Sequence, residues 1–226
     1  MSHLGRPMIV SAEDMGTTAG VRQPSDEGRP VVAFDFDGTL TCRDSYIAFL
    51  RWRAGDRGLV AGLAPLLPSL LAFTIDRDRG RLKARVSRQF LGTVGRGRLE
   101  SDARRFGATA FARLLRPDAL VCWRAWRARG ACLFIVTASP EILVAPFAAA
   151  LGADGLIGTR LAFDADDRFT GALEGVNCRG MEKVRRLRAV FGPGLRLEAA
   201  YGDSGGDREM LAIARTPGMK AFRGRP

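Results

Sequence analysis

The sequence predicts an α/β fold in which helices cover both faces of a parallel sheet and a helical segment is inserted after the first strand. Apolar strand-like runs lack the alternation of a half-exposed sheet, which is typical of strands buried on both faces. Segments with helical periodicity separate these runs, and the alternation favours parallel pairing. The 226 residues, of which 46% are hydrophobic, are enough for one large domain or for a domain with an insertion.

Three apolar runs are the predicted central strands, and two weaker patterns predict further strands. The first strand is predicted over Val31–Asp37, the second over Ala131–Thr137 and the third over Leu195–Tyr201. Residues Leu156–Leu173, with Asp-Asp-Arg in the middle, are typical of a β-hairpin, and Met219–Phe222 is predicted as a short last strand. The predicted sheet therefore draws on most of the chain.

Helical periodicity fills the intervals between these strands. We predict helices over Glu141–Leu151, Gly180–Phe191 and Asp207–Arg215. Gly192 and Pro193 follow the middle helix and are a typical stop signal, because glycine tolerates the left-handed conformation and proline cannot continue a helix.

The chain divides into three predicted regions. Residues 1–29 are rich in Gly, Ser, Pro and charge without a sustained period, so we predict a flexible tail. Residues 42–116 have a helical pattern with many arginines, and their position directly after the first strand predicts a cap above the strand ends. The segments 30–41 and 117–226 form the predicted core that carries the sheet.

Charge and rare residue types limit the function classes. The formal net charge of +11 fits an anionic partner such as nucleic acid, acidic lipid headgroups or a phosphorylated substrate, although solvated arginine-rich helix faces explain it equally well. His3 is the only histidine and lies in the predicted tail, which argues against a catalytic or metal-binding histidine. The four cysteines form no CxxC pair and the N-terminal residues lack a signal-peptide core, so a cytoplasmic location is predicted.

The first predicted strand ends in two carboxylates. Asp35 and Asp37 stand at positions i and i+2, which point to one side of a strand, and Gly38 allows the chain to turn directly after them. Like charges buried side by side are unfavourable unless a cation neutralises them. The pair therefore indicates a metal site, a nucleophile beside a general acid/base, or both.

Polar residues also end the other two predicted central strands. Thr137 ends the second strand, Asp203 follows the third with Asp207 four residues on, and Lys183 lies in the preceding helix. Each alone has an ordinary explanation as a helix-cap residue, a turn former or a solvated side chain. Ligands of open α/β sheets bind outside the carboxyl ends of the strands, so the joint placement of these residues predicts a site at this edge.

The order and strand context of these motifs resemble the phosphatase branch of the haloacid dehalogenase superfamily. The residues that carry the resemblance are Asp35–Thr41, Thr137, Lys183 and Gly202–Asp207, and the match spans Val31–Phe222. The resemblance implies a Rossmann-like core of subfamily IB, which is phosphoserine phosphatase-like. The cysteine-phosphatase pattern HCx5R and the P-loop pattern GxxxxGK[ST] are absent from the sequence.

The resemblance implies a role for each aspartate of the strand ends. Asp35 would attack phosphorus and form an aspartyl-phosphate, while Asp37 would protonate the leaving oxygen and then activate water. A second aspartate at this position favours phosphoryl transfer over carbon–halogen cleavage within the superfamily. Asp35, Asp203 and the backbone carbonyl of Asp37 would bind Mg²⁺, which prefers hard oxygen ligands. Asp207 would position Lys183 or a water on the metal.

The same resemblance implies how the phosphoryl group is held. Thr137 would donate a hydrogen bond to the phosphoryl oxygens. Lys183 would neutralise them as a point charge. Both residues are therefore predicted phosphate ligands.

The insertion is expected to select the substrate. Asp44 falls where phosphoserine phosphatases carry a glutamate for the substrate amino group, and its shorter side chain disfavours serine. The stretch Leu59–Ile75 has no charge and is flanked by arginines, but Pro65 and Pro68 interrupt it, so it is a poor transmembrane helix. It is expected either to enter a bilayer surface, with arginines on anionic headgroups, or to pack within the cap.

The leading sequence-based hypothesis is a Mg²⁺-dependent phosphatase acting on a membrane lipid phosphate such as phosphatidylglycerophosphate. Residues 59–75 together with Asn177–Lys183 resemble the phosphatidylglycerophosphatase C type, which also predicts peripheral contact with the inner face of the membrane. One alternative is a soluble phosphatase of a small phosphorylated metabolite. Another is a non-enzymatic basic protein that binds nucleic acid, which the intact set of aspartates disfavours.

Overall fold

The structure is a computed structural model that describes residues 8–9, 28–67 and 79–226. Its centre is a sheet of parallel strands in the order β1-β4-β3-β2-β6-β7, and β5 pairs with β4 in the antiparallel sense. The described strands are β1 (Met8–Ile9), β2 (Val31–Phe34), β3 (Cys132–Pro140), β4 (Gly155–Phe163), β5 (Phe169–Glu174), β6 (Leu197–Gly202) and β7 (Ala214–Met219). The described α-helices are α1 (Ser45–Leu63), α3 (Arg79–Leu91), α4 (Arg96–Leu114), α5 (Pro117–Ala128), α6 (Glu141–Leu151), α7 (Met181–Phe191) and α8 (Arg208–Ala212).

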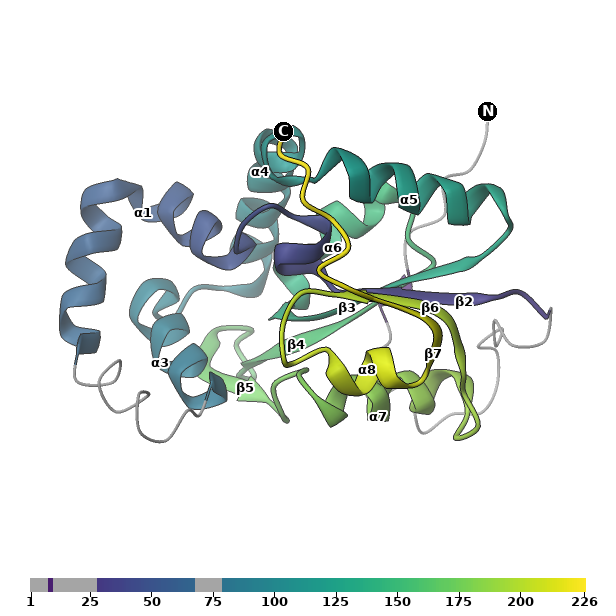
Figure 1. Cartoon of the computed structure of the whole chain (residues 1–226). Coiled ribbons are helices and arrows are strands. Elements are labelled where there is room, and N and C mark those ends of the chain that lie inside the picture. Colours follow the sequence, from purple (N-terminus) through teal and green to yellow (C-terminus); the bar gives the residue numbers. More distant parts are fainter. Residues whose placement is uncertain (1–7, 10–27, 68–78) are drawn as a thin grey trace, which may run out of the picture.

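Helices cover both faces of the sheet (Figure 1). α5 and α6 lie over one face and α7 and α8 over the other. β2 shows why this arrangement suits the sequence, because its side chains alternate between the two faces and all of them are buried. Val32 and Phe34 belong to the core under α5 and α6, while Val31 and Ala33 belong to the core under α7 and α8. The predicted fold class is confirmed.

The strand order aligns the ends of the three central strands. β2 lies between β3 and β6, and Phe34 pairs with Ile135 on one side and with Tyr201 on the other. All three strands run in the same direction. The polar residues that follow them therefore emerge together at the carboxyl edge of the sheet.

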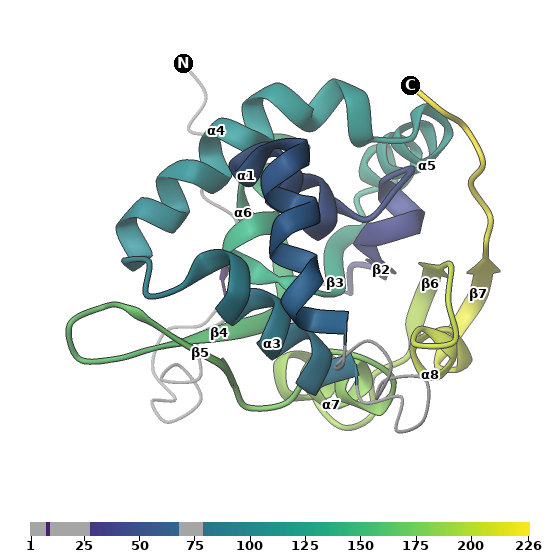
Figure 2. The ribbon, with the colours of Figure 1, turned by 90° about the vertical axis from the view of Figure 1, so that its left-hand side faces the viewer.

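Among the described residues, the α-helices α1, α3 and α4 lie between β2 and α5 in the chain and stand beyond this edge of the sheet (Figure 2). The Tyr46 hydroxyl and the Ser87 hydroxyl are 2.6 Å apart, and this hydrogen bond joins α1 to α3. α4 packs back on the core, where the Phe106 ring meets the Phe147 ring of α6 at a centroid distance of 6.0 Å. The helical insertion expected after the first strand is present, while the division into tail, cap and core stays a prediction.

The first central strand is shorter than predicted. β2 ends at Phe34 and not at Asp37. The following residues form one wide turn, because the Thr41 N–H donates to the Phe36 carbonyl at 2.9 Å and Gly38 takes a φ of 78°. The two aspartates therefore leave a turn, and the expectation that they share one face of a strand was wrong.

The C-terminal elements also differ in their bounds. The predicted helix over Asp207–Arg215 is limited to Arg208–Ala212, and the last strand is Ala214–Met219 where Met219–Phe222 was predicted. The physical reason is pairing, because β7 lies parallel to β6 along its whole length. Lys220 then takes a φ of 52° and ends the strand.

Several other predictions are confirmed or fall partly outside the described residues. β4 and β5 form the predicted hairpin. Met8 and Ile9 of the predicted tail pair with β4, while residues 1–7 and 10–27 lie outside the described residues, as do residues 68–75 of the apolar stretch. Within the part of the chain that the structure describes, no helix is long and apolar enough to cross a membrane.

Candidate active site

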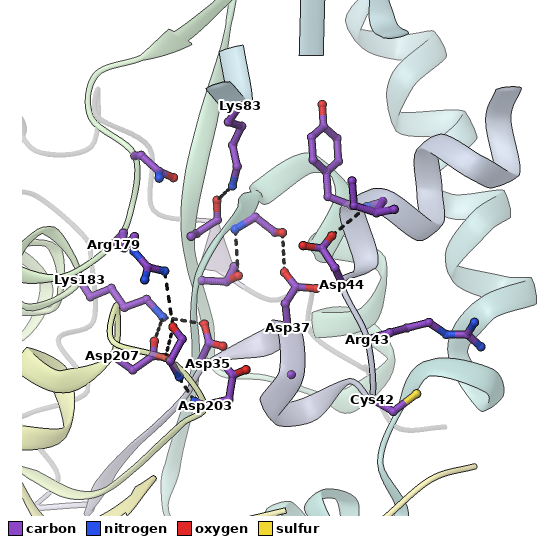
Figure 3. Close-up of a pocket in the computed structure, with 18 of the residues that line it drawn as sticks. Asp35, Asp37, Cys42, Arg43, Asp44, Lys83, Arg179, Lys183, Asp203 and Asp207 are labelled. Atoms are coloured by element: carbon purple, nitrogen blue, oxygen red, sulfur yellow. Dashed lines mark hydrogen bonds and ion pairs between the residues drawn. The ribbon is translucent and has the colours of Figure 1, made fainter. Parts of the chain in front are cut away.

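A cavity of about 790 Å³ opens at the carboxyl edge of the sheet (Figure 3). β2, β3 and β6 lead into it, and α1, α3 and α7 contribute further side chains. All of the residues that the sequence nominates for the site line this cavity. They are Asp35, Asp37, Asp44, Thr137, Lys183, Asp203 and Asp207.

Lys183 is the centre of a buried network of charges. Its Nζ atom donates to Asp35 Oδ1, to Asp207 Oδ1 and to the Val136 carbonyl, each at 2.6 Å. These bonds use the three donors of an ammonium group, so a phosphoryl oxygen must replace one partner in order to bind Lys183. Burial lowers the pKa of Lys183, but the charges of Asp35 and Asp207 outweigh burial and leave the pKa above its ordinary value.

Asp35 has one firmly held oxygen and one freer oxygen. Oδ1 is fixed by Lys183, whereas Oδ2 has a longer contact of 3.4 Å from the Thr39 hydroxyl. Burial raises the pKa of Asp35 to about 7, with the charge of Lys183 opposing this rise and the charge of Asp207 adding to it. The carboxylate is therefore costly to ionise in the absence of a bound cation.

We expect the metal-free protein to lose stability as the pH rises from 3.8 to about 7, because of Asp35. The pKa of Asp35 is raised on folding, so the folded state binds this proton more tightly and its ionisation lowers the free energy of unfolding. Urea unfolding with EDTA at about pH 5 and about pH 8 measures the loss, and Asp35→Asn should lose less. An equal pH dependence in both proteins would contradict this assignment.

Asp37 is held by a different set of groups from those around Asp35. The Ser139 hydroxyl donates to Asp37 Oδ2 at 2.5 Å, and the Ser45 N–H at the start of α1 donates to Oδ1 at 2.6 Å. Burial raises the pKa of Asp37, the charge of Asp44 adds to this rise, and the bonds from the two serines oppose it. A carboxyl group with a raised pKa can carry a proton nearer to neutral pH, as a general acid requires.

Three carboxylates could share a cation. Oxygens of Asp35, Asp203 and Asp207 lie within 4.8 Å of one another, and carboxylate oxygens are the ligands that Mg²⁺ prefers. Asp207 is the least available of the three, because Oδ1 accepts from Lys183 and Oδ2 accepts from the Ser204 N–H and hydroxyl, each at 3.0 Å. Burial raises the pKa of Asp203 and the charge of Asp207 raises it further, so a cation would relieve both carboxylates. The donor set therefore fits a hard divalent cation.

Gly38 is required where the turn passes Asp203. With a φ of 78°, a Cβ at this position would be strained and would also collide with the Asp203 carboxylate. We expect Gly38→Ala to lower the free energy of unfolding by about 1–3 kcal/mol. Gly130→Ala is the matched control, because Gly130 has a φ of 74° with nothing within 4 Å of its Cβ position. Equal losses in urea unfolding of the two variants would show that the contact with Asp203 has no effect.

The last two nominated residues also make local structural contacts. Thr137 is buried and its Oγ1 accepts from the Ser139 N–H at 3.0 Å, which orients the serine that holds Asp37. Asp44 Oδ1 accepts from the Ile47 N–H at 2.8 Å and so caps α1. Their predicted contacts with substrate stay predictions.

Three further residues of the cavity were not nominated from the sequence as site residues, although Arg179 lies in the stretch Asn177–Lys183 that carried part of the resemblance. Ser139 lies two residues after Thr137, the nominated strand end, so its position was a visible signal. Lys83 reaches the cavity from α3 and donates to the Ala138 carbonyl, and burial lowers its pKa while the charge of Asp37 opposes this. Arg179 donates to the Ser204 hydroxyl at 3.5 Å. Nothing in the spacing of Lys83 or Arg179 identifies them, because only tertiary packing brings them here.

Comparisons with known proteins show the family and the fold of this chain. The family described as haloacid dehalogenase-like hydrolase matches residues 32–212. "Protein CicA" of Caulobacter vibrioides is 58% identical over 196 residues, covering 87% of this chain and 88% of that protein. A solved structure of a protein of unknown function from Bordetella pertussis Tohama I has a TM-score of 0.68 at 26% identity and covers 84% of this chain and 88% of that chain. A phosphoserine phosphatase solved as a phospho-aspartyl intermediate analogue shares the fold, with a TM-score of 0.55 at 20% identity, covering 84% of this chain and 85% of that chain.

Proposed function

Because the chain belongs to the haloacid dehalogenase-like hydrolase family, we propose that this hydrolase cleaves phosphomonoesters with Mg²⁺ and through a phosphorylated Asp35. The observation that carries the proposal is that Asp35 lines the cavity, is buried and bonded to Lys183, and lies within reach of Asp203. Phosphoserine phosphatases among the proteins of similar fold support the same reaction class.

Asp35 is placed to act as the nucleophile. The bond from Lys183 fixes Oδ1, so the freer Oδ2 is the oxygen that can attack phosphorus. A new bond between Oδ2 and phosphorus forms as the ester oxygen leaves with its electron pair. Lys183 then neutralises the charge that gathers on the carboxylate and the transferred group.

Asp37 supplies and recovers the proton. Its protonated carboxyl would donate to the leaving oxygen, and its ionised form would then take a proton from the water that cleaves the aspartyl-phosphate. The bonds from Ser139 and Ser45 orient the carboxylate for both steps. Mg²⁺ held by Asp35, Asp203 and the Asp37 backbone carbonyl would supply the positive charge that lets a phosphate approach these carboxylates.

The substrate we propose is a membrane lipid phosphate such as phosphatidylglycerophosphate. The net charge of +11 favours approach to an anionic surface, and Arg43, Lys83 and Arg179 add cations to the cavity. In the described part of the apolar stretch, Val60 and Leu67 are 70% and 57% exposed, which supports peripheral contact with the inner face of the membrane. A small phosphorylated metabolite is the second candidate, because Asp44 lines the cavity and could receive a substrate amino group.

Phosphate release from a substrate panel tests this proposal. The purified protein is assayed with phosphatidylglycerophosphate, phosphoserine and p-nitrophenyl phosphate, after EDTA treatment and again after Mg²⁺ is restored. We expect no turnover with EDTA, recovery with Mg²⁺, and the highest kcat/KM for the lipid. A much higher kcat/KM for phosphoserine would end the lipid assignment, and salt-dependent binding of nucleic acid without any turnover would end the phosphatase assignment.

A further inference from the structure

A second cavity lies beside the catalytic cavity and has a different character. It has a volume of about 810 Å³ and lies between α1 and α4. Most of its wall is apolar. The apolar side chains of its lining are Ile47, Ala48, Trp52, Phe106, Ala110 and Leu114. The proposed chemical steps use none of these residues, so this cavity needs a separate explanation.

The two cavities meet at the beginning of α1. Arg43, Asp44 and Ile47 line both of them. Ile47 is a large apolar side chain that is 45% exposed at this junction. Asp44 Oδ1 is engaged in capping α1, and Ile47 is the only apolar side chain among the three residues that the two linings share. A ligand whose phosphate lies at Asp35 can therefore extend past Ile47 into the second cavity.

Arginines stand at the rim of this apolar lining. Arg43, Arg51 and Arg113 are all exposed and line the second cavity. Asp44 is the only acidic residue among the described residues of this lining. Arg51 forms an ion pair with Asp56 at 2.6 Å. This pair is exposed to solvent, because 78% of the Asp56 side chain is accessible. A concave apolar wall with a cationic rim is complementary to an amphiphile that has a hydrocarbon chain and an anionic headgroup.

We infer that the cavity between α1 and α4 binds an acyl chain of a lipid phosphomonoester whose phosphate occupies the catalytic cavity. The inference rests on the proposed function and adds a place for the apolar part of the substrate. Two observations carry it: the shared lining at Arg43–Ile47 and the pairing of apolar side chains with arginines. Burial of methylene groups in this cavity would make catalytic efficiency depend on chain length.

Filling the cavity tests the inference. Ala48 lines the cavity and is only partly buried, so Ala48→Phe adds volume there without replacing a core side chain. The substrates are dihexanoyl and dibutanoyl phosphatidylglycerophosphate, both as dissolved monomers, and p-nitrophenyl phosphate. We expect the ratio of kcat/KM for the dihexanoyl lipid to that for p-nitrophenyl phosphate to fall about tenfold in Ala48→Phe, and the dibutanoyl ratio to fall less.

A second variant and a control keep the result interpretable. Arg113→Glu changes an exposed residue of the rim and should also lower the dihexanoyl ratio, even if Ala48→Phe fails to fold. Arg124→Glu on α5 is an exposed arginine outside both cavities and should leave the ratio unchanged. Unchanged ratios in folded Ala48→Phe and Arg113→Glu would overturn the acyl-chain site and leave the phosphatase intact. No turnover of any substrate by the unmodified protein would overturn both proposals.

Discussion

Replacing Asp35 with asparagine is expected to lower kcat for every phosphomonoester by about 10⁴-fold or more. The amide is nearly isosteric but cannot form the acyl-phosphate bond, because its nitrogen and oxygen are poor nucleophiles. The fold should survive, since Asp35→Asn removes one of two carboxylates around Lys183 and leaves the 2.6 Å bond to Asp207. Loss of turnover in a folded protein is therefore the expected signature of a missing nucleophile.

The measurement is phosphate release from p-nitrophenyl phosphate with Mg²⁺, together with a thermal unfolding curve of the same sample. Asp166→Asn is the matched control, because Asp166 is an exposed carboxylate in the turn between β4 and β5. Brief reaction with ³²P-labelled substrate followed by acid quench should label the unmodified protein and not Asp35→Asn. Turnover of Asp35→Asn within tenfold of the unmodified rate would remove Asp35 from the proposed mechanism.

Much of the central sheet could be predicted because its strands are buried on both faces. An uninterrupted apolar run such as Val31–Phe34 has few alternative structures once a glycine-containing turn follows it. The rule that ligands bind at the carboxyl ends of parallel strands then brings Thr137 and Asp203 beside Asp35 without any knowledge of strand order. The structure places all three in one cavity.

The local geometry of the nucleophile turn was beyond the same reasoning. Strand periodicity predicts that Asp35 and Asp37 share a face of the sheet. The bond from the Thr41 N–H to the Phe36 carbonyl instead closes a turn, so the two aspartates have different hydrogen-bond partners. Asp35 consequently faces Lys183, while Asp37 faces the serines at the ends of β3 and α1. Gly38 indicated a turn after the aspartates, because glycine readily adopts the left-handed conformation. The number of residues in that turn does not follow from the sequence alone.

The cap contacts depend on how helices of the insertion pack, which helical periodicity does not specify. Lys83 reaches Ala138 only because α3 lies across the strand ends, joined to α1 by the bond between Tyr46 and Ser87. The apolar cavity beside Trp52 arises in the same way, from the spacing between α1 and α4. We expect substrate selection to depend on these contacts, so the sequence carries less information on the substrate than on the reaction class.

Replacing Lys183 with methionine is expected to lower the free energy of unfolding by about 3–5 kcal/mol at neutral pH. Lys183 is almost completely buried and forms ion pairs of 2.6 Å with both Asp35 and Asp207, so its loss leaves two buried carboxyl groups that must either ionise without a counter-charge or take up a proton. The effect has a defined pH range. Burial raises the pKa of Asp207, but the charge of Lys183 outweighs burial and leaves this pKa below 3.8. The contribution of the Asp207 ion pair to the free energy of unfolding is therefore present above pH 3.8. It is lost as the pH falls through the pKa of Asp207 in the folded state.

A double-mutant cycle separates this electrostatic cost from lost packing. Asp207→Asn removes one of the carboxylates that Lys183→Met leaves unpaired, so the double variant should lose clearly less stability than the sum of the single losses. Arg196→Met is the control, because Arg196 is exposed outside both cavities and its loss should change stability by less than about 0.5 kcal/mol. Urea unfolding in EDTA gives all four values without a bound cation. Additive losses, or a loss below about 1 kcal/mol for Lys183→Met, would mean that water already compensates these carboxylates and that the network around Asp35 is less buried than its geometry indicates.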